Sequence, residues 1–313
     1  MIICVSANPA IDRRLRLDRL GVGAVNRASS VSPMPGGKAA HVAMAAAALG
    51  ERVMWVGFLG GASGEDCERG LTGLGIPVAV VKTAAETRTN MEIVEADGTV
   101  TEILEPGGAV TERDVERMLS LCRDVFVEHR GAAQVALSGS LPPGCPDDFY
   151  AQLTRLAHAQ RCRVLLDASG EALRAGLRGS PDLVKPNREE AEALTGFRLV
   201  GARSAAEAAR ALFDAGAGGV AISLGADGMF WQESSGAAPL VARPPRVEAR
   251  SPVGCGDAAL AGFAVARRRG LTGHEFVRFA AACGTANCLA DAPGMIDRRQ
   301  VERLLPQSSV EGA

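Results

Sequence analysis

A short glycine-rich motif, Gly254-Cys255-Gly256-Asp257, runs directly into an apolar segment with the composition of a helix. Glycines allow a turn where a Cβ would interfere, so the amides of this turn and of the first helical turn can point at one spot. The partial positive charge of a helix N-terminus favours an anion such as a phosphate there. Asp257 would repel that anion, but it makes sense as a base that takes a proton from an attacking hydroxyl. The alternative is an ordinary helix cap.

Further polar residues stand where strands are expected to end. Lys38, after two glycines, and Arg88, between two threonines, could form a two-cation clamp on a phosphate or could be surface residues. Lys185 ends a strand ahead of a proline. Asn187 and Glu190 have the spacing of a capping box, although Glu190 could also act on Mg²⁺ through water. Each motif has a structural alternative, so the motifs gain weight only together.

Composition excludes several classes of function. The chain has 313 residues, 47% of them hydrophobic, and a net charge of −2. This is enough for one large α/β domain or one domain with a small accessory, and it disfavours nonspecific binding to nucleic acids or membranes. Eight cysteines form no Cys-x-x-Cys pair and no zinc pattern, and the N-terminus lacks the features of a signal peptide. We therefore expect a reduced, cytoplasmic protein.

Strand and helix patterns alternate along the chain. Strands are expected at 2–7, 53–59, 78–82, 133–138, 163–167, 182–185, 219–224, 229–232 and 240–249. Helices are expected at 39–49, 64–74, 111–128, 146–160, 171–178, 188–195, 204–215, 257–269, 273–291 and 297–305. This order predicts a parallel sheet covered on both faces, with ligands beyond the carboxyl ends of its strands. The tail 307–313 is expected to fray.

Two segments do not follow this alternation. Residues 13–34 read as a strand pair, and residues 88–105 read as a hairpin with an Asp97-Gly98 turn and period-two alternation. We expect them to form a small antiparallel sheet outside the core.

Seven motifs occur together in a characteristic order: Asn8-Pro9-Ala10-x-Asp12, Gly36-Gly37-Lys38, Thr87-Arg88-x-Asn90, Ser138-Gly139-Ser140-Leu141-Pro142, Lys185-Pro186-Asn187-x-x-Glu190, Ser223-Leu224-Gly225-x-x-Gly228 and Gly254-x-Gly256-Asp257. In this order the chain resembles the ribokinase-like PfkB carbohydrate kinases over about residues 3–305. The branch that it resembles phosphorylates sugar phosphates, as 1-phosphofructokinase, tagatose-6-phosphate kinase and the minor 6-phosphofructokinase do.

The resemblance implies a three-layer α/β/α fold with a mostly parallel central sheet and a small β-sheet lid. Residues 1–12, 35–87 and 107–313 would form the core, and residues 13–34 and 88–106 the lid. It implies ATP and Mg²⁺, leaves room for a monovalent cation, and suggests a homodimer formed through the lid. Nucleic acid and membrane partners are not expected.

The resemblance also implies roles for individual residues. Asp257 would be the base, and the anion hole would be formed by Gly254, Cys255, Gly256 and Asp257. Nucleotide and metal would be served by Lys185, Asn187, Glu190, Ser223, Gly225, Gly228 and Asn287, with Glu190 acting on the metal through water. The sugar would be held by Asp12, Gly37 and His41, and its phosphate by Lys38, Arg88 and Ser138.

Three residues depart from the family pattern. His41 stands where the family usually has Asn, Pro252 where it has Thr, and Cys255 where it has Ala. Lys38 with Arg88 favours an acceptor that is already phosphorylated: fructose 1-phosphate, fructose 6-phosphate or tagatose 6-phosphate. Two alternatives remain open, a kinase of an unphosphorylated sugar or nucleoside and a non-catalytic sensor of sugar phosphate or nucleotide.

Overall fold

A ten-stranded sheet forms the centre of the molecule, and the computed structural model describes all 313 residues. Seven neighbouring strands run parallel: β5 (Val78–Lys82), β4 (Val53–Leu59), β1 (Ile2–Ser6), β8 (Gln134–Ser138), β9 (Arg163–Asp167), β10 (Leu183–Val184) and β11 (Val220–Ser223). Three more extend it in antiparallel fashion: β12 (Met229–Gln232), β13 (Leu240–Arg243) and β14 (Ser309–Gly312). The predicted, mostly parallel sheet is confirmed.

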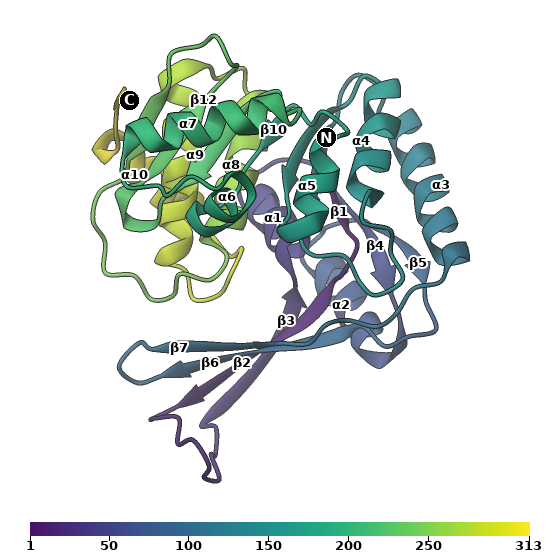
Figure 1. The fold of residues 1–313 in the computed structure, drawn as a ribbon. Helices are drawn as coiled ribbons and strands as arrows, with labels where there is room; N and C mark the ends of the chain where they lie inside the picture. The colour runs from purple at the N-terminus through teal and green to yellow at the C-terminus, as the bar shows by residue number, and fades with distance from the viewer.

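Helices cover both faces of this sheet (Figure 1). One face packs against α1 (Lys38–Ala48), α2 (Gly61–Gly73), α8 (Cys255–Arg268), α9 (Gly273–Cys288) and α10 (Arg298–Leu304). The other packs against α3 (Glu112–Glu128), α4 (Phe149–Ala159), α5 (Gly170–Leu177), α6 (Arg188–Thr195) and α7 (Ala202–Asp214). Successive side chains of a strand point to opposite faces, so Ile2 and Cys4 join one core and Ile3 and Val5 the other. The three-layer prediction is confirmed.

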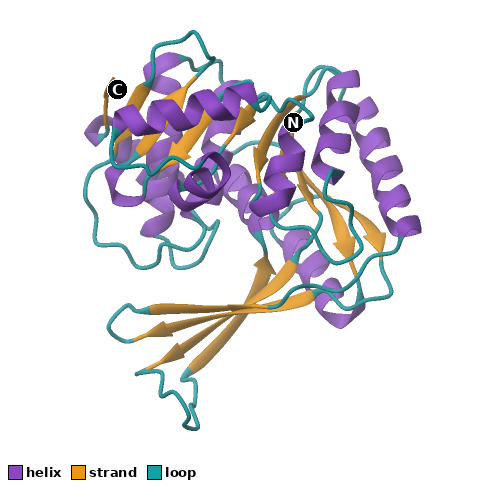
Figure 2. Ribbon diagram, viewed as in Figure 1, coloured by secondary structure: helices purple, strands orange, loops and turns teal.

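A second, four-stranded sheet projects from the body (Figures 1 and 2). Its strands, in spatial order, are β3 (Ser30–Gly36), β2 (Ala10–Leu17), β6 (Arg88–Glu95) and β7 (Val100–Leu104). The expected strand pair and hairpin are both present, but β2 and β6 pair in parallel. The expectation of a purely antiparallel sheet was wrong, because both strands leave the core in the same direction and lie side by side.

The C-terminal tail also differs from expectation. Residues 309–312 form β14 and pair with β13, which would otherwise be an exposed edge. The backbone hydrogen bonds of this edge hold the tail, so the prediction of a frayed end was wrong. The strand expected at 240–249 ends at Arg243, and the helix expected at 273–291 ends at Cys288.

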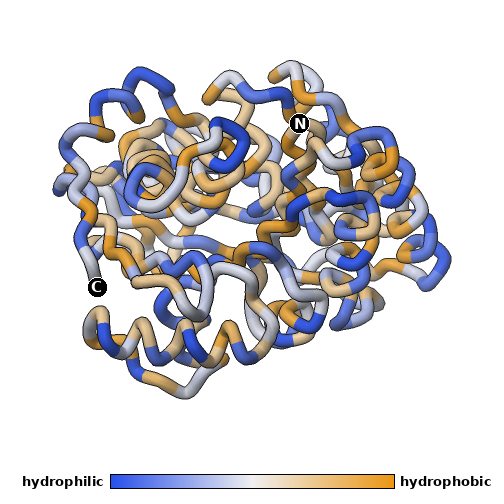
Figure 3. Tube along the Cα trace, turned by 90° about the horizontal axis from the view of Figure 1, so that it is seen from above, coloured by the Kyte–Doolittle hydropathy of each residue, from blue (hydrophilic) through white to orange (hydrophobic).

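Hydrophobic segments run through the middle of the molecule and hydrophilic ones follow its outer loops (Figure 3). No helix is both long and apolar enough to cross a lipid bilayer.

Candidate active site

The turn before α8 has the geometry that its glycines predict. Gly254 has a φ of 78°, in the left-handed region, and a Cβ there would lie 2.7 Å from Pro293. A Cβ on Gly256 would lie 3.2 Å from the Lys185 ammonium, so that cation stands beside the turn. Asp257 lies in the first turn of α8 and is 6% exposed. A buried carboxylate, a cation and a helix N-terminus therefore meet here.

Asn287 of α9 fastens this turn to the rest of the fold. Its amide nitrogen donates to the Val253 carbonyl at 2.7 Å, and its amide oxygen accepts from the Gly294 N–H at 2.8 Å. The sulfurs of Cys255 and Cys288 are 2.7 Å apart, and this contact together with burial raises the pKa of the Cys255 thiol. The sequence-predicted Cys255 and Asn287 thus pack against each other at the base of the turn.

A second cluster surrounds Asp167, the last residue of β9. Its carboxylate oxygens lie 2.8 Å from the ammonium of Lys38 and 2.8 Å from that of Lys185. Burial would raise the pKa of Asp167, but the two lysines outweigh it and hold that pKa below its ordinary value. Two lysines that the sequence placed in different roles therefore share one buried counter-ion.

Asn187 and Glu190 form a complete capping box at the start of α6. The Asn187 side chain accepts from the Glu190 N–H at 2.8 Å, and Glu190 accepts from the Asn187 N–H at 2.9 Å. The other Glu190 oxygen lies 3.7 Å from the Lys38 ammonium. No group of three or more His, Cys, Asp or Glu side chains is arranged to hold a metal ion. Glu190 therefore suits Mg²⁺ that is held through water and nucleotide phosphates, as this ion commonly is, better than an all-protein cage.

His41 lies between the lid and the α8 turn. Its Nε2 is 2.8 Å from Asp12 Oδ2, and its Nδ1 is 2.8 Å from Asp257 Oδ2. Asn90 donates to the other Asp12 oxygen at 2.8 Å. Burial would raise the pKa of Asp12, but hydrogen bonding to His41 and Asn90 and the charge of His41 hold it below its ordinary value. Gly36 lies so close to the Asp12 carboxylate that any Cβ would collide with it.

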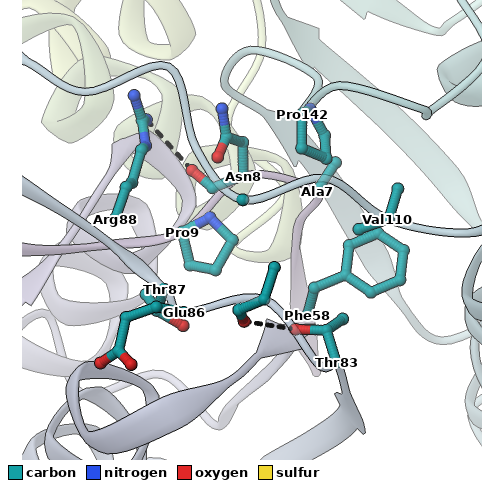
Figure 4. A pocket seen from close by; sticks show the side chains of 12 residues that line it. Ala7, Asn8, Pro9, Phe58, Thr83, Glu86, Thr87, Arg88, Val110 and Pro142 are labelled. Atoms are coloured by element: carbon teal, nitrogen blue, oxygen red, sulfur yellow. Dashed lines mark hydrogen bonds between the residues drawn. The ribbon is translucent and has the colours of Figure 1, made fainter.

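Arg88 lies at the base of the lid. Its guanidinium donates to the carbonyls of Asn8 at 3.1 Å and Glu105 at 2.8 Å, at the rim of a hollow of about 20 Å³ (Figure 4). A Cβ on Gly139 would lie 3.9 Å from the Lys38 side chain. Arg88 donates to the carbonyl of Asn8, and the Asn8 side chain donates to the Ser140 hydroxyl at 3.0 Å. Both residues therefore lie near the turn at 138–140.

Other predicted residues lie along the same edge. The Ser138 hydroxyl is buried and has no hydrogen-bond partner. Ser223 forms a β-bridge with Asn187, and Gly225 and Gly228 bound a short turn with φ of 64° and 98°. Gly37, with a φ of 81°, caps α1. The structure thus places these residues around one edge of the sheet, and their roles stay predictions.

Two features of the site were not predicted from the sequence. Asp167 was noted only as the end of a strand, although an acidic residue at the carboxyl end of a buried parallel strand is a signal for a ligand edge. The second is a chain of three buried side chains, Arg14, Glu92 and Ser251, that joins the lid to the loop before Gly254. No local pattern predicts that chain, because its members come from three distant segments.

The chain is similar over most of its length to known carbohydrate kinases. The model of the pfkB family carbohydrate kinases matches residues 2–294. A 1-phosphofructokinase of Xanthomonas campestris pv. campestris is 41% identical over 270 residues, which is 84% of this chain and 83% of that protein. A tagatose-6-phosphate kinase of Staphylococcus epidermidis is 31% identical over 99% of both chains. The structure of Escherichia coli phosphofructokinase-2 with potassium has a TM-score of 0.89 and 30% identity, covering 97% of this chain and 98% of that one.

Proposed function

The chain belongs to the pfkB family of carbohydrate kinases and is an ATP-dependent sugar-phosphate kinase, and we propose that its acceptor is a phosphorylated ketohexose. The start of α8 supports the kinase reaction, because a buried carboxylate, a helix N-terminus and the Lys185 ammonium lie together there. Fructose 1-phosphate is the first acceptor to test, since the relative at 41% identity is named 1-phosphofructokinase. Tagatose 6-phosphate and fructose 6-phosphate are the other two.

In the proposed reaction, Asp257 takes the proton of the acceptor hydroxyl while that oxygen attacks the γ-phosphorus of ATP. The 254–257 amides and Lys185 stabilise the charge on the transferred group. Mg²⁺ would neutralise the nucleotide phosphates, with Glu190 acting through water. The remaining nucleotide contacts would come from Asn187, Ser223, Gly225 and Gly228, while Asn287 holds the turn in place.

The sugar-phosphate end of the site is proposed to lie between Asp12 and the turn at 138–140. Asp12 and Gly37 hold the sugar, and Lys38, Arg88 and Ser138 hold its phosphate. The buried Ser138 hydroxyl, which has no hydrogen-bond partner, and the two cationic residues near the turn support this assignment. Closure of the lid over the site would exclude water, which otherwise competes for the phosphoryl group.

We further propose a cytoplasmic homodimer that forms through the lid. Strand register places Leu15, Val31, Met91 and Ile103 on the face of the small sheet opposite Asp12 and Asn90, and three of these four are exposed. Such an apolar face needs a partner surface. Escherichia coli phosphofructokinase-2 has been solved as an inhibited tetramer and with potassium, so a monovalent cation also belongs in the assay.

The two alternatives have less support. An unphosphorylated acceptor would not need Lys38 and Arg88 at one turn. A non-catalytic sensor would need neither Asp257 nor Lys185 beside it, and His41 and Pro252 are the only features in its favour.

The experiment is ADP release with Mg·ATP, with and without K⁺, on fructose 1-phosphate, fructose 6-phosphate, tagatose 6-phosphate, fructose, ribose and adenosine. We expect turnover of one phosphorylated ketose and a loss of at least about 1000-fold in Asp257→Ala. Turnover of only fructose, ribose or adenosine would establish the first alternative. Binding of ATP and a sugar phosphate without ADP release would establish the sensor.

A further inference from the structure

His41 joins two carboxylates that belong to different parts of the fold. Asp12 lies 29 positions before it in β2, and Asp257 lies 216 positions after it in α8. The His41 side chain is only 6% exposed, and the turn at Gly294 packs on its backbone so closely that a Cβ there would lie 2.8 Å from the His41 carbonyl oxygen. The imidazole is therefore fixed in place between its two partners.

The two contacts require a proton on each ring nitrogen. An ionised carboxylate only accepts hydrogen bonds, so both nitrogens of His41 must donate. Burial lowers the pKa of His41, but hydrogen bonds and charges from Asp12 and Asp257 outweigh it and raise that pKa to about 10. The bridge therefore carries one positive charge between two negative ones at neutral pH.

Other charged groups face this bridge from the neighbouring elements. Glu102 of β7 is close enough for His41, Asp12 and Asp257 all to act on its charge. Lys38, one turn earlier in α1, acts on Asp257, and Arg88 of β6 acts on Asp12. Cys67 of α2 faces Asp12 as a neutral thiol, since burial raises its pKa to about 12. None of these groups makes a hydrogen bond to the imidazole, so the protonation state of His41 depends mainly on Asp12 and Asp257.

We propose that His41 is a positioning residue that bridges the sugar-binding carboxylate, Asp12, and the catalytic base, Asp257. This inference rests on the proposed function of the site. Asn90 and His41 each hold one Asp12 oxygen, and His41 holds Oδ2 of Asp257, which leaves Asp257 Oδ1 for the acceptor hydroxyl. The bridge thereby sets where the base stands relative to the carboxylate that orients the sugar.

In the reaction, the hydroxyl proton passes to Oδ1 of Asp257. The hydroxyl oxygen forms its bond to the γ-phosphorus as the bond from that phosphorus to the ADP oxygen breaks. His41 keeps both of its protons, because an imidazolium that donates from both nitrogens has no lone pair to accept another. It is therefore not the base itself. An asparagine at this position would donate from one nitrogen atom only, so it could not reproduce two contacts that are made from two separate ring nitrogens.

The first test measures the protonation of His41 without any turnover. In protein labelled with ¹⁵N-histidine, the His41 signals are assigned by their loss in His41→Asn. We expect both His41 nitrogens to remain protonated from pH 6 to 9, and to begin titrating in that range in Asp257→Asn and Asp12→Asn, where one charged partner is gone. His158→Asn is the matched control: its imidazole faces one carboxylate, Asp182, and has no hydrogen bond to His41, Asp12 or Asp257, so its loss should leave the His41 signals in place.

The second test is kinetic. We expect His41→Asn to lower kcat about 10- to 100-fold with the KM for ATP changed less than about 2-fold, and to move the acid limb of the kcat/KM profile for the sugar phosphate to higher pH, because a positive charge beside the base is lost. His158→Asn should retain wild-type kinetics. A melting curve confirms folding, and His41→Gln replaces His41→Asn if that variant does not fold.

Two results would overturn the proposal. One is a wild-type His41 that titrates between pH 6 and 8, because the bridge would then be neutral. The other is His41→Asn with unchanged kcat and an unchanged pH profile. A protein without kinase activity but with a permanently protonated His41 would refute the proposed function and leave the bridge in place.

Discussion

At the scale of single residues, Asp167 is the shared counter-ion of the two lysines in the candidate site. It is 1% exposed, and its carboxylate faces Lys38 and Lys185 at 2.8 Å each. A buried carboxylate between two ammonium groups stabilises all three charges, and removing it would leave two cations unpaired. Asp167 thus holds in position two of the residues proposed to contact phosphates.

Asp167→Asn should lower the free energy of unfolding by about 3 kcal/mol, because the lysines lose their counter-ion. Because the pKa of Asp167 in the folded protein lies below its ordinary value, its stabilising contribution is complete above the ordinary aspartate range and is lost as the pH falls below about 4. Urea unfolding should therefore show a steeper loss of stability between about pH 5 and pH 2 in the wild type than in the variant. If stability fell equally steeply with pH in both proteins, the lysines would not be lowering the pKa of Asp167.

Arg88→Ala should raise the KM for the phosphorylated acceptor at least about 10-fold, with little change in the KM for ATP, because one cation of the phosphate site is lost. Initial-rate kinetics with each substrate varied in turn measures this. Arg27→Ala is the control, since Arg27 is an exposed arginine in the loop between β2 and β3. A KM for the acceptor that equals the wild-type value would remove Arg88 from the site.

At the scale of elements, the lid and the α8 turn are joined by buried side chains. Arg14 of β2 donates twice to Glu92 of β6, at 2.8 Å each, and the Ser251 hydroxyl donates to the same carboxylate at 3.1 Å. All three are at most 8% exposed. Ser251 lies three residues before Gly254, so this hydrogen bond connects the lid strands to the proposed anion hole.

Ser251→Ala removes this link, together with the local contact from the Val253 N–H to the same hydroxyl at 3.2 Å, without leaving a buried charge unpaired, because Arg14 keeps Glu92. The lost hydrogen bond to a charged group should cost about 1.5–3 kcal/mol locally. Amide hydrogen exchange of residues 250–256 should therefore become at least about 10-fold faster, and kcat should fall several-fold. Ser29→Ala, which alters an exposed hydroxyl elsewhere in the lid, is the control. Unchanged exchange at 250–256 would mean that the lid does not order the turn.

At the scale of the whole molecule, the small sheet is the part that stands away from the body (Figure 2). Its inner face presents Asp12, Asn90 and Glu92, and its outer face carries Met91 at 37% and Ile103 at 51% exposure. Successive residues of these strands thus point alternately to the face that carries Asp12 and to the apolar face.

The double substitution Met91→Glu and Ile103→Glu should convert the proposed dimer to a monomer, because two charges directly opposite each other on paired strands would face the partner. Light scattering coupled to size-exclusion chromatography at micromolar concentration measures the mass. Val200→Glu, at a residue 82% exposed on the body, should leave the mass unchanged. A wild-type monomer would refute the lid-mediated dimer.

Much of the fold could be predicted because its signals are local. Apolar runs of β1 and β4 and the turn glycines before α8 read correctly, since period, propensity and turn chemistry are written in neighbouring residues. The parallel pairing of β2 with β6 and the docking of β14 on β13 could not be predicted. Both depend on which strand edge the chain meets after folding, and no nearby residue specifies that.

The sequence by itself determined the family, the sheet with its two helical layers, and most residues of the candidate site. Only the tertiary structure decided which of those residues form hydrogen bonds and ion pairs with one another. Lys38 meets Asp167 across 129 positions and His41 meets Asp257 across 216, so each contact depends on several elements packed in register. A hydrogen bond forms only within about 3 Å, and no spacing along the chain specifies a distance that the whole fold must set.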